Sequence, residues 1–127
     1  MDNLKTILIV DDASLVRLYY RSILEPAGFR IEEALNGVEA LEKLQSAAVD
    51  LLIVDINMPL MDGLTMLETL RQMALPIAAT PALITSTESA DKDFAAARAA
   101  GANYYLVKPV DRDSLLEVAA MLCGAPQ

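Results

Sequence analysis

Short apolar runs alternate along the chain with longer stretches in which apolar residues recur at helical spacing. Runs of β-branched and other apolar residues predict strands, whereas apolar residues three and four positions apart predict amphipathic helices. Five strand–helix pairs can be counted, with strands expected at Thr6–Val10, Phe29–Ala34, Leu51–Val54, Ala82–Thr85 and Tyr104–Val107. This alternation predicts an α/β fold built on a parallel sheet.

Helices are expected between consecutive strands and after the last one. The first is expected to have Ser14 as its N-cap and to end at Glu25-Pro26, because proline disfavours helical geometry in the residue before it. The others are expected to begin near Gly37, near Gly63 with Asp62 as N-cap, at Asp91 and near Asp111.

The helix expected at Asp91–Ala100 is unusual, because its apolar residues are Phe94 and otherwise only alanines. Such a helix can bury little apolar surface against the sheet. This would suit a segment that moves, although alanine is also simply the best helix former.

The composition of the strands indicates their order in the sheet. The runs at 7–10, 51–54 and 82–84 are apolar on both faces, as central parallel strands are, whereas Arg30-Ile31-Glu32-Glu33 is mixed and is expected at an edge. This is compatible with a doubly wound, flavodoxin-like, five-stranded sheet of order 2-1-3-4-5 with helices on both faces. In that arrangement, ligands bind beyond the carboxyl ends of strands one and three.

Polar residues stand where four of the predicted strands end: Asp11-Asp12, Asp55, Thr85-Ser86 and Lys108-Pro109. The carboxyl ends of parallel strands share one edge of the sheet, so these side chains are expected in one crevice. Three carboxylates without a neighbouring histidine or arginine repel one another unless a cation joins them. Oxygen ligands of this kind suit Mg²⁺, and Lys108 would add a second positive charge.

Length and composition indicate a single compact domain spanning residues 1–127. The chain has 54% hydrophobic and 22% charged residues, which is too apolar for a disordered segment. Its 10 basic and 18 acidic residues give a formal net charge of −8, which disfavours direct binding to nucleic acids and to anionic lipids.

The cysteine and histidine content excludes several classes of site. A single cysteine, Cys123, cannot form an internal disulfide, and the absence of histidine removes the usual zinc and histidine-based catalytic sets. The N-terminal residues lack a secretory signal pattern, and the apolar runs are too short to span a membrane. We therefore expect a cytoplasmic protein without membrane insertion.

Several motifs together resemble the receiver domain of two-component response regulators, over nearly the whole chain. The matching segments are Ile9-Val10-Asp11-Asp12, Asp55-Ile56-Asn57-Met58-Pro59-Leu60-Met61-Asp62-Gly63, Ser86-Thr87-Glu88, Ala100-Gly101-Ala102 and Tyr105-Leu106-Val107-Lys108-Pro109. Each segment alone is a weak signal, but the combination is highly specific. The strand order proposed above agrees with the known order of this family.

The resemblance implies a role for each residue of the crevice. Asp55 would be the phosphoryl acceptor, and Asp11 and Asp12 would hold Mg²⁺ directly or through water. Asn57 would lend its backbone carbonyl to the metal, and Lys108 would contact the phosphoryl group.

The resemblance also implies a conformational switch. Ser86 would swing toward the phosphoryl oxygen, and Tyr105 would turn inward to fill the vacated space, while the bond before Pro109 would be cis. Thr87 stands where alanine or glycine is usual. With Asn57 and Glu88, it is expected to tune the rate of dephosphorylation.

The resemblance predicts a response regulator that catalyses only its own phosphorylation and dephosphorylation and is not otherwise an enzyme. Its donor would be a histidine kinase or a histidine phosphotransfer protein. Because the chain ends soon after the last predicted helix, output is expected through protein contacts. The expected docking face is formed by the fourth helix, the fifth strand and the fifth helix.

Other functions are less compatible with these residues or remain open. Asn57 stands where a haloacid dehalogenase-type phosphatase needs its second acid, and Asp11-Asp12 would repel the phosphate of a flavin. A phosphorylation-independent pseudo-receiver scaffold, a phosphate sink and a relay intermediate remain open. Chemotaxis-like signalling is favoured by the stretch 29–37 and by the Asn57 and Glu88 pair.

Overall fold

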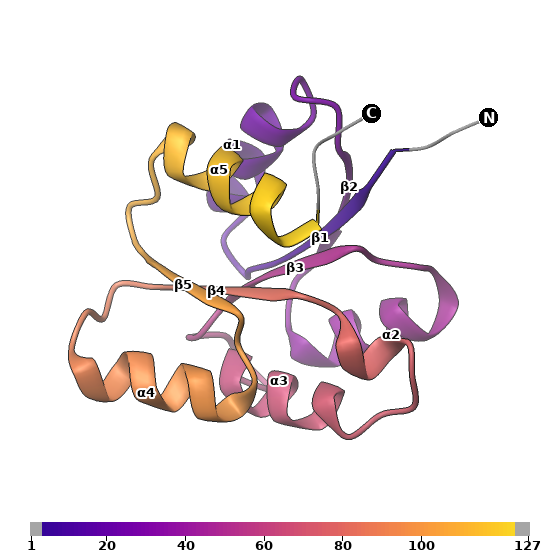
Figure 1. Ribbon diagram of the computed structural model, residues 1–127, viewed down its shortest axis with the longest axis vertical. Coiled ribbons are helices and arrows are strands. Elements are labelled where there is room, and N and C mark those ends of the chain that lie inside the picture. Colours follow the sequence, from indigo (N-terminus) through magenta and orange to yellow (C-terminus); the bar gives the residue numbers. More distant parts are fainter. Residues whose placement is uncertain (1–3, 124–127) are drawn as a thin grey trace.

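The computed structural model describes residues 4–123 and consists of a five-stranded parallel sheet between two layers of helices (Figure 1). The strands are β1 (Thr6–Val10), β2 (Arg30–Ala34), β3 (Leu51–Asp55), β4 (Ala82–Ser86) and β5 (Tyr104–Val107). The helices are α1 (Ser14–Leu24), α2 (Gly37–Ser46), α3 (Gly63–Arg71), α4 (Asp91–Ala100) and α5 (Arg112–Cys123), with a short 3₁₀ helix at Ile77–Ala79. No helix in this part of the chain is long and apolar enough to cross a membrane.

The sheet has the order β2-β1-β3-β4-β5, so the predicted fold class and strand order are confirmed. Helices α1 and α5 cover one face, and α2, α3 and α4 cover the other (Figure 1). Each face has its own cluster of buried apolar side chains, because strands β1, β3 and β4 send alternate residues to opposite sides. The mixed strand β2 lies at an edge, as its charged residues predicted.

Two strands extend one residue further than the sequence pattern predicted, and β2 begins one residue later. Asp55 and Ser86 are the last residues of β3 and β4, so the ladder itself holds the backbone of both. Phe29 precedes β2 and is buried in the cluster beneath α1 and α5. Asp55 and Ser86 are therefore placed by strand pairing.

Ser14 is not the N-cap of α1, so that prediction was wrong. Ala13 occupies the cap position, and its backbone N–H donates to Asp11 Oδ1 at 2.9 Å. The Asp11 side chain thus directs the turn into α1, which leaves no capping role for Ser14. By contrast, Asp62 is confirmed as the N-cap of α3, because its Oδ1 accepts the Thr65 N–H at 2.8 Å.

Gly63 brings the start of α3 against the end of β3. A Cβ atom at this position would lie 2.4 Å from the Asp55 carbonyl oxygen, which is too close for any residue with a side chain. The Gly63 N–H donates to the carbonyl of Ile56 at 2.9 Å. Glycine is therefore required for the loop that follows Asp55 to fold back over the sheet edge.

Helix α4 is attached to the molecule mainly at its carboxyl end. Only Ala97 and Ala100 are buried within it, as its alanine-rich sequence predicted. After its last residue, Gly101 adopts a positive φ of 111°, and the Gly101 carbonyl accepts two hydrogen bonds from the guanidinium of Arg71 at 3.0 and 2.8 Å. In the first turn of α4, Phe94 is only half-buried and packs on the ring of Tyr105.

Candidate functional site

Three carboxylates lie together at the carboxyl edge of the sheet, as the sequence predicted. Asp11 follows β1, Asp12 comes next, and Asp55 ends β3. One carboxylate oxygen from each residue lies within 4.8 Å of the others. Asp11 and Asp55 are 1% and 6% exposed, whereas Asp12 is open to solvent. The cluster therefore has a buried base and an exposed rim.

Lys108 provides the positive charge at the base of this cluster. Its Nζ donates to Asp11 Oδ2 and to Asp55 Oδ1, both at 3.1 Å. The lysine backbone is itself held by its N–H, which donates to the Ser86 carbonyl at 2.7 Å. The following bond to Pro109 is cis, as the resemblance implied. Lys108 directly follows β5, and its side chain reaches past β4 to the acidic residues that follow β1 and end β3.

Burial and charge act in opposite directions on these groups. Burial raises the pKa of Asp55, and the charge of Asp11 adds to this effect, while Lys108 and the Asn57 backbone N–H oppose it. Burial alone would lower the pKa of Lys108, but Asp11 and Asp55 outweigh it and raise this pKa. Lys108 is therefore a firmly protonated ammonium between two carboxylates.

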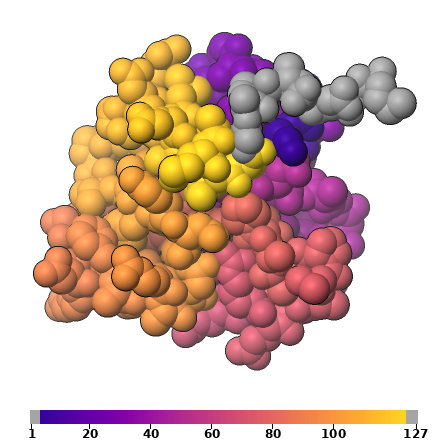
Figure 2. All heavy atoms as spheres, viewed as in Figure 1, coloured from indigo at the N-terminus to yellow at the C-terminus, as the bar shows by residue number. Residues whose placement is uncertain are grey.

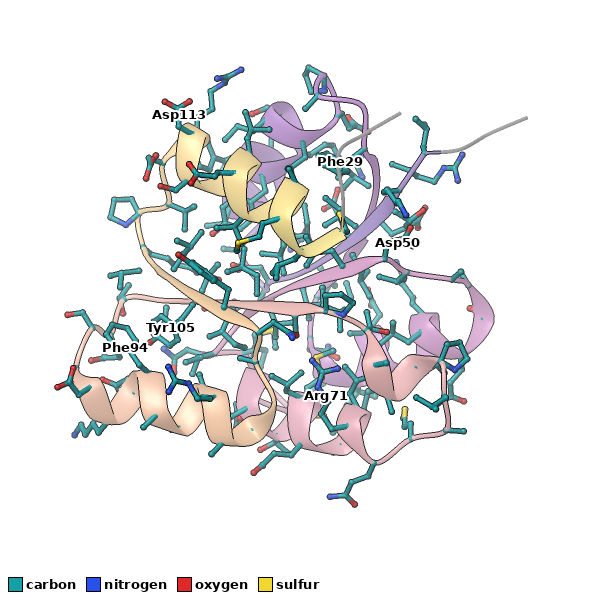
Figure 3. All side chains as sticks on the ribbon, in the orientation of Figure 1. Phe29, Asp50, Arg71, Phe94, Tyr105 and Asp113 are labelled. Carbon is teal, nitrogen blue, oxygen red and sulfur yellow. The ribbon has the colours of Figure 1, made fainter. Side chains whose placement is uncertain are left out.

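Ser86 and Tyr105 both contact the backbone of Glu88. The Ser86 side chain is fully buried, and its hydroxyl oxygen accepts the Glu88 N–H at 3.0 Å. The Tyr105 hydroxyl donates to the Glu88 carbonyl at 2.9 Å, and its ring packs edge-on against Phe94 of α4 with centroids 4.7 Å apart (Figure 3). The loop after β4 therefore joins the edge of the site to helix α4.

The family of the chain follows from comparison with known proteins. The family model for the response regulator receiver domain matches residues 7–120. The chain belongs to this family. The Bacillus subtilis chemotaxis protein CheY is 38% identical over 112 residues, which cover 87% of this chain and 91% of that protein.

Two further relatives illustrate the settings in which this domain occurs. The Vibrio cholerae CAI-1 autoinducer sensor kinase/phosphatase CqsS is 32% identical over 116 residues, or 91% of this chain but only 17% of that protein. The structure of Vibrio cholerae chemotaxis protein CheY4 superposes with a TM-score of 0.87 at 33% identity, covering 94% of this chain and 98% of that one. The chain is thus a receiver domain of the CheY type.

The donor set of this receiver domain fits a hard divalent cation. The groups that converge are carboxylate oxygens, with the exposed loop at Asn57 two residues beyond Asp55. No nitrogen or sulfur ligand belongs to the cluster in the described residues. Such a set, partly open to water, is the kind that Mg²⁺ prefers.

Thr87 and Glu88, expected to tune dephosphorylation together with Asn57, are exposed in the loop after β4, and Asn57 is exposed in the loop after β3. Thr87 also borders a hollow of about 350 Å³ that lies between α1 and the segment Lys108–Val110. The walls of this hollow are mainly apolar, and Lys108 connects it to the acidic cluster. Thr87 and Lys108 therefore line the same hollow.

Sequence reasoning missed an ion pair that supports the acidic cluster from the side of α1. Arg17 donates through Nη1 to the Asp11 carbonyl and through Nε to Glu33 Oε1, each at 2.7 Å. Burial alone would raise the pKa of Glu33, but Arg17 and Arg21 outweigh it and lower this pKa. The order of strands β2 and β1, which places Glu33 beside the first helix, contained the signal for this pair.

Proposed function

We propose that this receiver domain accepts a phosphoryl group on Asp55 from the phosphohistidine of a histidine kinase or histidine phosphotransfer protein. The observation that carries the proposal is the position of Asp55 at the end of a central strand, bound by Lys108 and within 4.8 Å of two further carboxylates. The protein would catalyse its own phosphorylation and dephosphorylation and act on no other substrate.

Transfer of the phosphoryl group needs a nucleophile and positive charge that offsets the negative charge of the phosphoryl oxygens. A carboxylate oxygen of Asp55 forms a bond to phosphorus while the P–N bond of the donor breaks, and the imidazole leaves with the electron pair. Lys108, already 3.1 Å from Asp55 Oδ1, is placed to neutralise the phosphoryl oxygens. The chain thus supplies both the attacking group and one of the charges that stabilise the transition state.

Asp11, Asp12 and Asp55, with the backbone carbonyl of Asn57, would hold Mg²⁺ at the rim of the cluster. When bound, the ion supplies further positive charge to the phosphoryl oxygens. The buried Asp11 is fixed for this role, because its carboxylate accepts the Ala13 N–H and its backbone carbonyl accepts a hydrogen bond from Arg17.

Incubation with acetyl phosphate and Mg²⁺ tests the proposal directly. Intact-mass spectrometry should show the addition of one phosphoryl group, which base treatment removes because an acyl phosphate is labile. A chain that gains no mass under these conditions would instead support the phosphorylation-independent scaffold.

The switch is proposed to run through Ser86 and Tyr105, because both are tied to Glu88 in this structure. If the Ser86 hydroxyl turns toward a phosphoryl oxygen, it releases the Glu88 N–H and loosens the loop that also holds Tyr105. The change would then reach α4, whose Phe94 packs on the Tyr105 ring.

We expect Ser86→Ala to be phosphorylated but to gain little target affinity on activation. The variant retains Asp55 and Lys108 but has no hydroxyl to pull the loop. The measurement compares pull-downs of beryllofluoride-treated and untreated protein, with Ser89→Ala as a control on an exposed serine of the same loop. An undiminished gain in Ser86→Ala would mean that the signal takes another route.

The target is proposed to bind the face formed by α4, β5 and α5, which lie on one side of the molecule (Figures 1 and 2). Tyr104 and Val107 of β5 are exposed there, and a hollow of about 290 Å³ lies between β5 and α4. The 38% identity to CheY favours a chemotaxis-like pathway. The second candidate function is that of an intermediate in a multistep relay, because one of the relatives is a sensor kinase.

Thr87→Ala should lose its phosphoryl group faster than the parent. The threonine stands at the rim beside Lys108, where its branched side chain narrows the approach of water in line with the Asp55–phosphorus bond. A barrier change of about 1.4 kcal/mol alters a rate tenfold, so modest crowding suffices for a measurable effect. The half-life is measured on purified phosphoprotein without a phosphatase, with Thr65→Ala at an exposed position of α3 as control. An equal or longer half-life would make Asn57, Glu88 or their loops the determinants.

A further inference from the structure

Thr85 carries a buried hydroxyl without a partner. The residue is 1% exposed, and its Oγ1 is the one buried side-chain oxygen or nitrogen in residues 4–123 that makes no hydrogen bond. Leaving a buried hydroxyl unpaired is unfavourable, and a valine of the same shape would avoid the cost. The position therefore needs an explanation beyond packing.

The location of Thr85 points to the phosphorylation site. Thr85 pairs in register with Asp55 on the neighbouring strand, so the two side chains stand on the same face of the sheet. That face is the one covered by α1 and α5, whereas the adjacent Ser86 faces the side of Tyr105 and α4. The two hydroxyls of β4 thus flank the site from opposite faces.

Tyr20 approaches Thr85 from the side of α1. Burial raises the pKa of the Tyr20 phenol, while the charge of Lys108 and the nearby Thr85 hydroxyl act in the opposite direction. Tyr20 belongs to the buried cluster beneath α1 and α5, on the face of the sheet where Thr85 stands, and Thr85 Oγ1 makes no hydrogen bond to it in this structure. Tyr20 also lines the hollow that Lys108 and Thr87 border, although the residue is only 2% exposed.

Lys108 has an N–H donor that could bind this pair of hydroxyls. Its ammonium group has three N–H donors, and two of them are assigned, to Asp11 and Asp55. When Asp55 is phosphorylated, one carboxylate oxygen becomes part of an acyl phosphate and the negative charge moves outward to the phosphoryl group. The lysine then needs a neutral acceptor on its inner side to stay directed at the new charge.

We propose that the Thr85 and Tyr20 hydroxyls are positioning residues that hold Lys108 at the phosphorylated site from the α1 face of the sheet. In this arrangement Tyr20 donates to Thr85 Oγ1, and Thr85 Oγ1 accepts the remaining N–H of Lys108. The hydroxyl that is unpaired in the unphosphorylated structure gains both partners in the phosphorylated form. The inference rests on the proposed phosphorylation of Asp55.

Two conservative variants test the pair by removing one hydroxyl each, Thr85→Val and Tyr20→Phe. Each should slow phosphorylation by acetyl phosphate by roughly three- to tenfold, the range expected for the loss of one hydrogen bond. The double variant should be no slower than the slower single variant, because both hydroxyls act in one chain of hydrogen bonds. Thr85→Ser, which keeps the hydroxyl, should restore most of the parent rate.

Unfolding measurements separate positioning from a structural role. Thr85→Val should be as resistant to denaturant as the parent or more so, because it removes an unpaired polar group from the interior. The matched control is Tyr19→Phe, which makes the same chemical change at a hydroxyl that bonds the Val110 carbonyl at 2.8 Å. This control should be phosphorylated at the parent rate.

The outcomes distinguish the inference from the function on which it rests. A parent that is phosphorylated while Thr85→Val and Tyr20→Phe match the Tyr19→Phe rate would overturn the positioning role alone. The positioning role would also be overturned if Thr85→Val were both slower to be phosphorylated and less stable than the parent, and if Thr85→Ser did not restore the rate. A parent that accepts no phosphoryl group would remove both proposals together.

Discussion

An Asp55→Asn variant should gain no phosphoryl group under conditions in which the parent gains one. The amide of asparagine is a far weaker nucleophile than a carboxylate and cannot form the acyl phosphate. Shape and burial are nearly unchanged, and Lys108 keeps its hydrogen bond to Asp11 at 3.1 Å, so the fold should persist. Intact-mass spectrometry after treatment with acetyl phosphate and Mg²⁺ measures the difference, which should be complete.

The control for this experiment is Asp62→Asn, in the loop that follows β3. Asp62 is exposed and caps α3, and asparagine is an equally good N-cap, so this variant should be phosphorylated like the parent. If Asp55→Asn still gained a base-labile phosphoryl group at the parent rate, the acceptor would be another residue. The cluster of charges around Asp55 would then need a different function.

The parts of the fold that the sequence predicted are those determined by a repeating pattern. Alternation of apolar runs with helical segments sufficed for the five strands, and the charged residues of β2 were enough to place that strand at an edge. Because parallel strands end at one edge, the same pattern also predicted that Asp11, Asp55 and Lys108 would lie together, as they do. The specific motifs agree with the family that the comparisons show.

The parts that the sequence did not predict depend on side-chain contacts between distant segments. Serine is a residue type that often caps helices, but the turn formed by Asp11 and the Ala13 N–H starts α1 one residue earlier, so that Ala13 takes the cap position. Propensity alone does not reveal such a turn. Likewise, the pairing of Arg17 with Glu33 depends on how α1 lies across β2. Nothing in the spacing of residues indicated that the hydroxyl of Thr85 would remain unpaired.

Asp12 is expected to dominate the affinity of the site for Mg²⁺, and the reason lies in how the three carboxylates are paired. Asp11 and Asp55 share the charge of Lys108, whereas Asp12 is exposed and forms no ion pair with any residue the structure describes. The three carboxylates and Lys108 together carry a net charge of −2, to which Asp12 contributes without an ion-pair partner in the described residues. Binding a divalent ion relieves the repulsion that this third charge creates.

Asp12→Asn should accordingly weaken Mg²⁺ binding by about tenfold or more, which corresponds to about 1.4 kcal/mol. The chain has four tyrosines and no tryptophan, so Mg²⁺-dependent tyrosine fluorescence or calorimetry can follow the titration. Glu68→Gln is the matched control, because it removes one charge from an exposed position on α3, away from the cluster. It corrects for the change in net charge, which both variants share.

Comparison of the two variants distinguishes binding of Mg²⁺ by Asp12 from long-range electrostatic attraction by the protein as a whole. If long-range attraction governed binding, both variants would weaken it by a similar small amount, and salt would screen both effects. If Asp12 binds the ion directly or through water, only Asp12→Asn loses affinity, and most of that loss persists at high salt. An Asp12→Asn variant that binds Mg²⁺ as tightly as the parent would show that Asp11, Asp55 and backbone oxygens suffice. Asp12 would then have no part in metal binding, and the role proposed for it at the rim would be wrong.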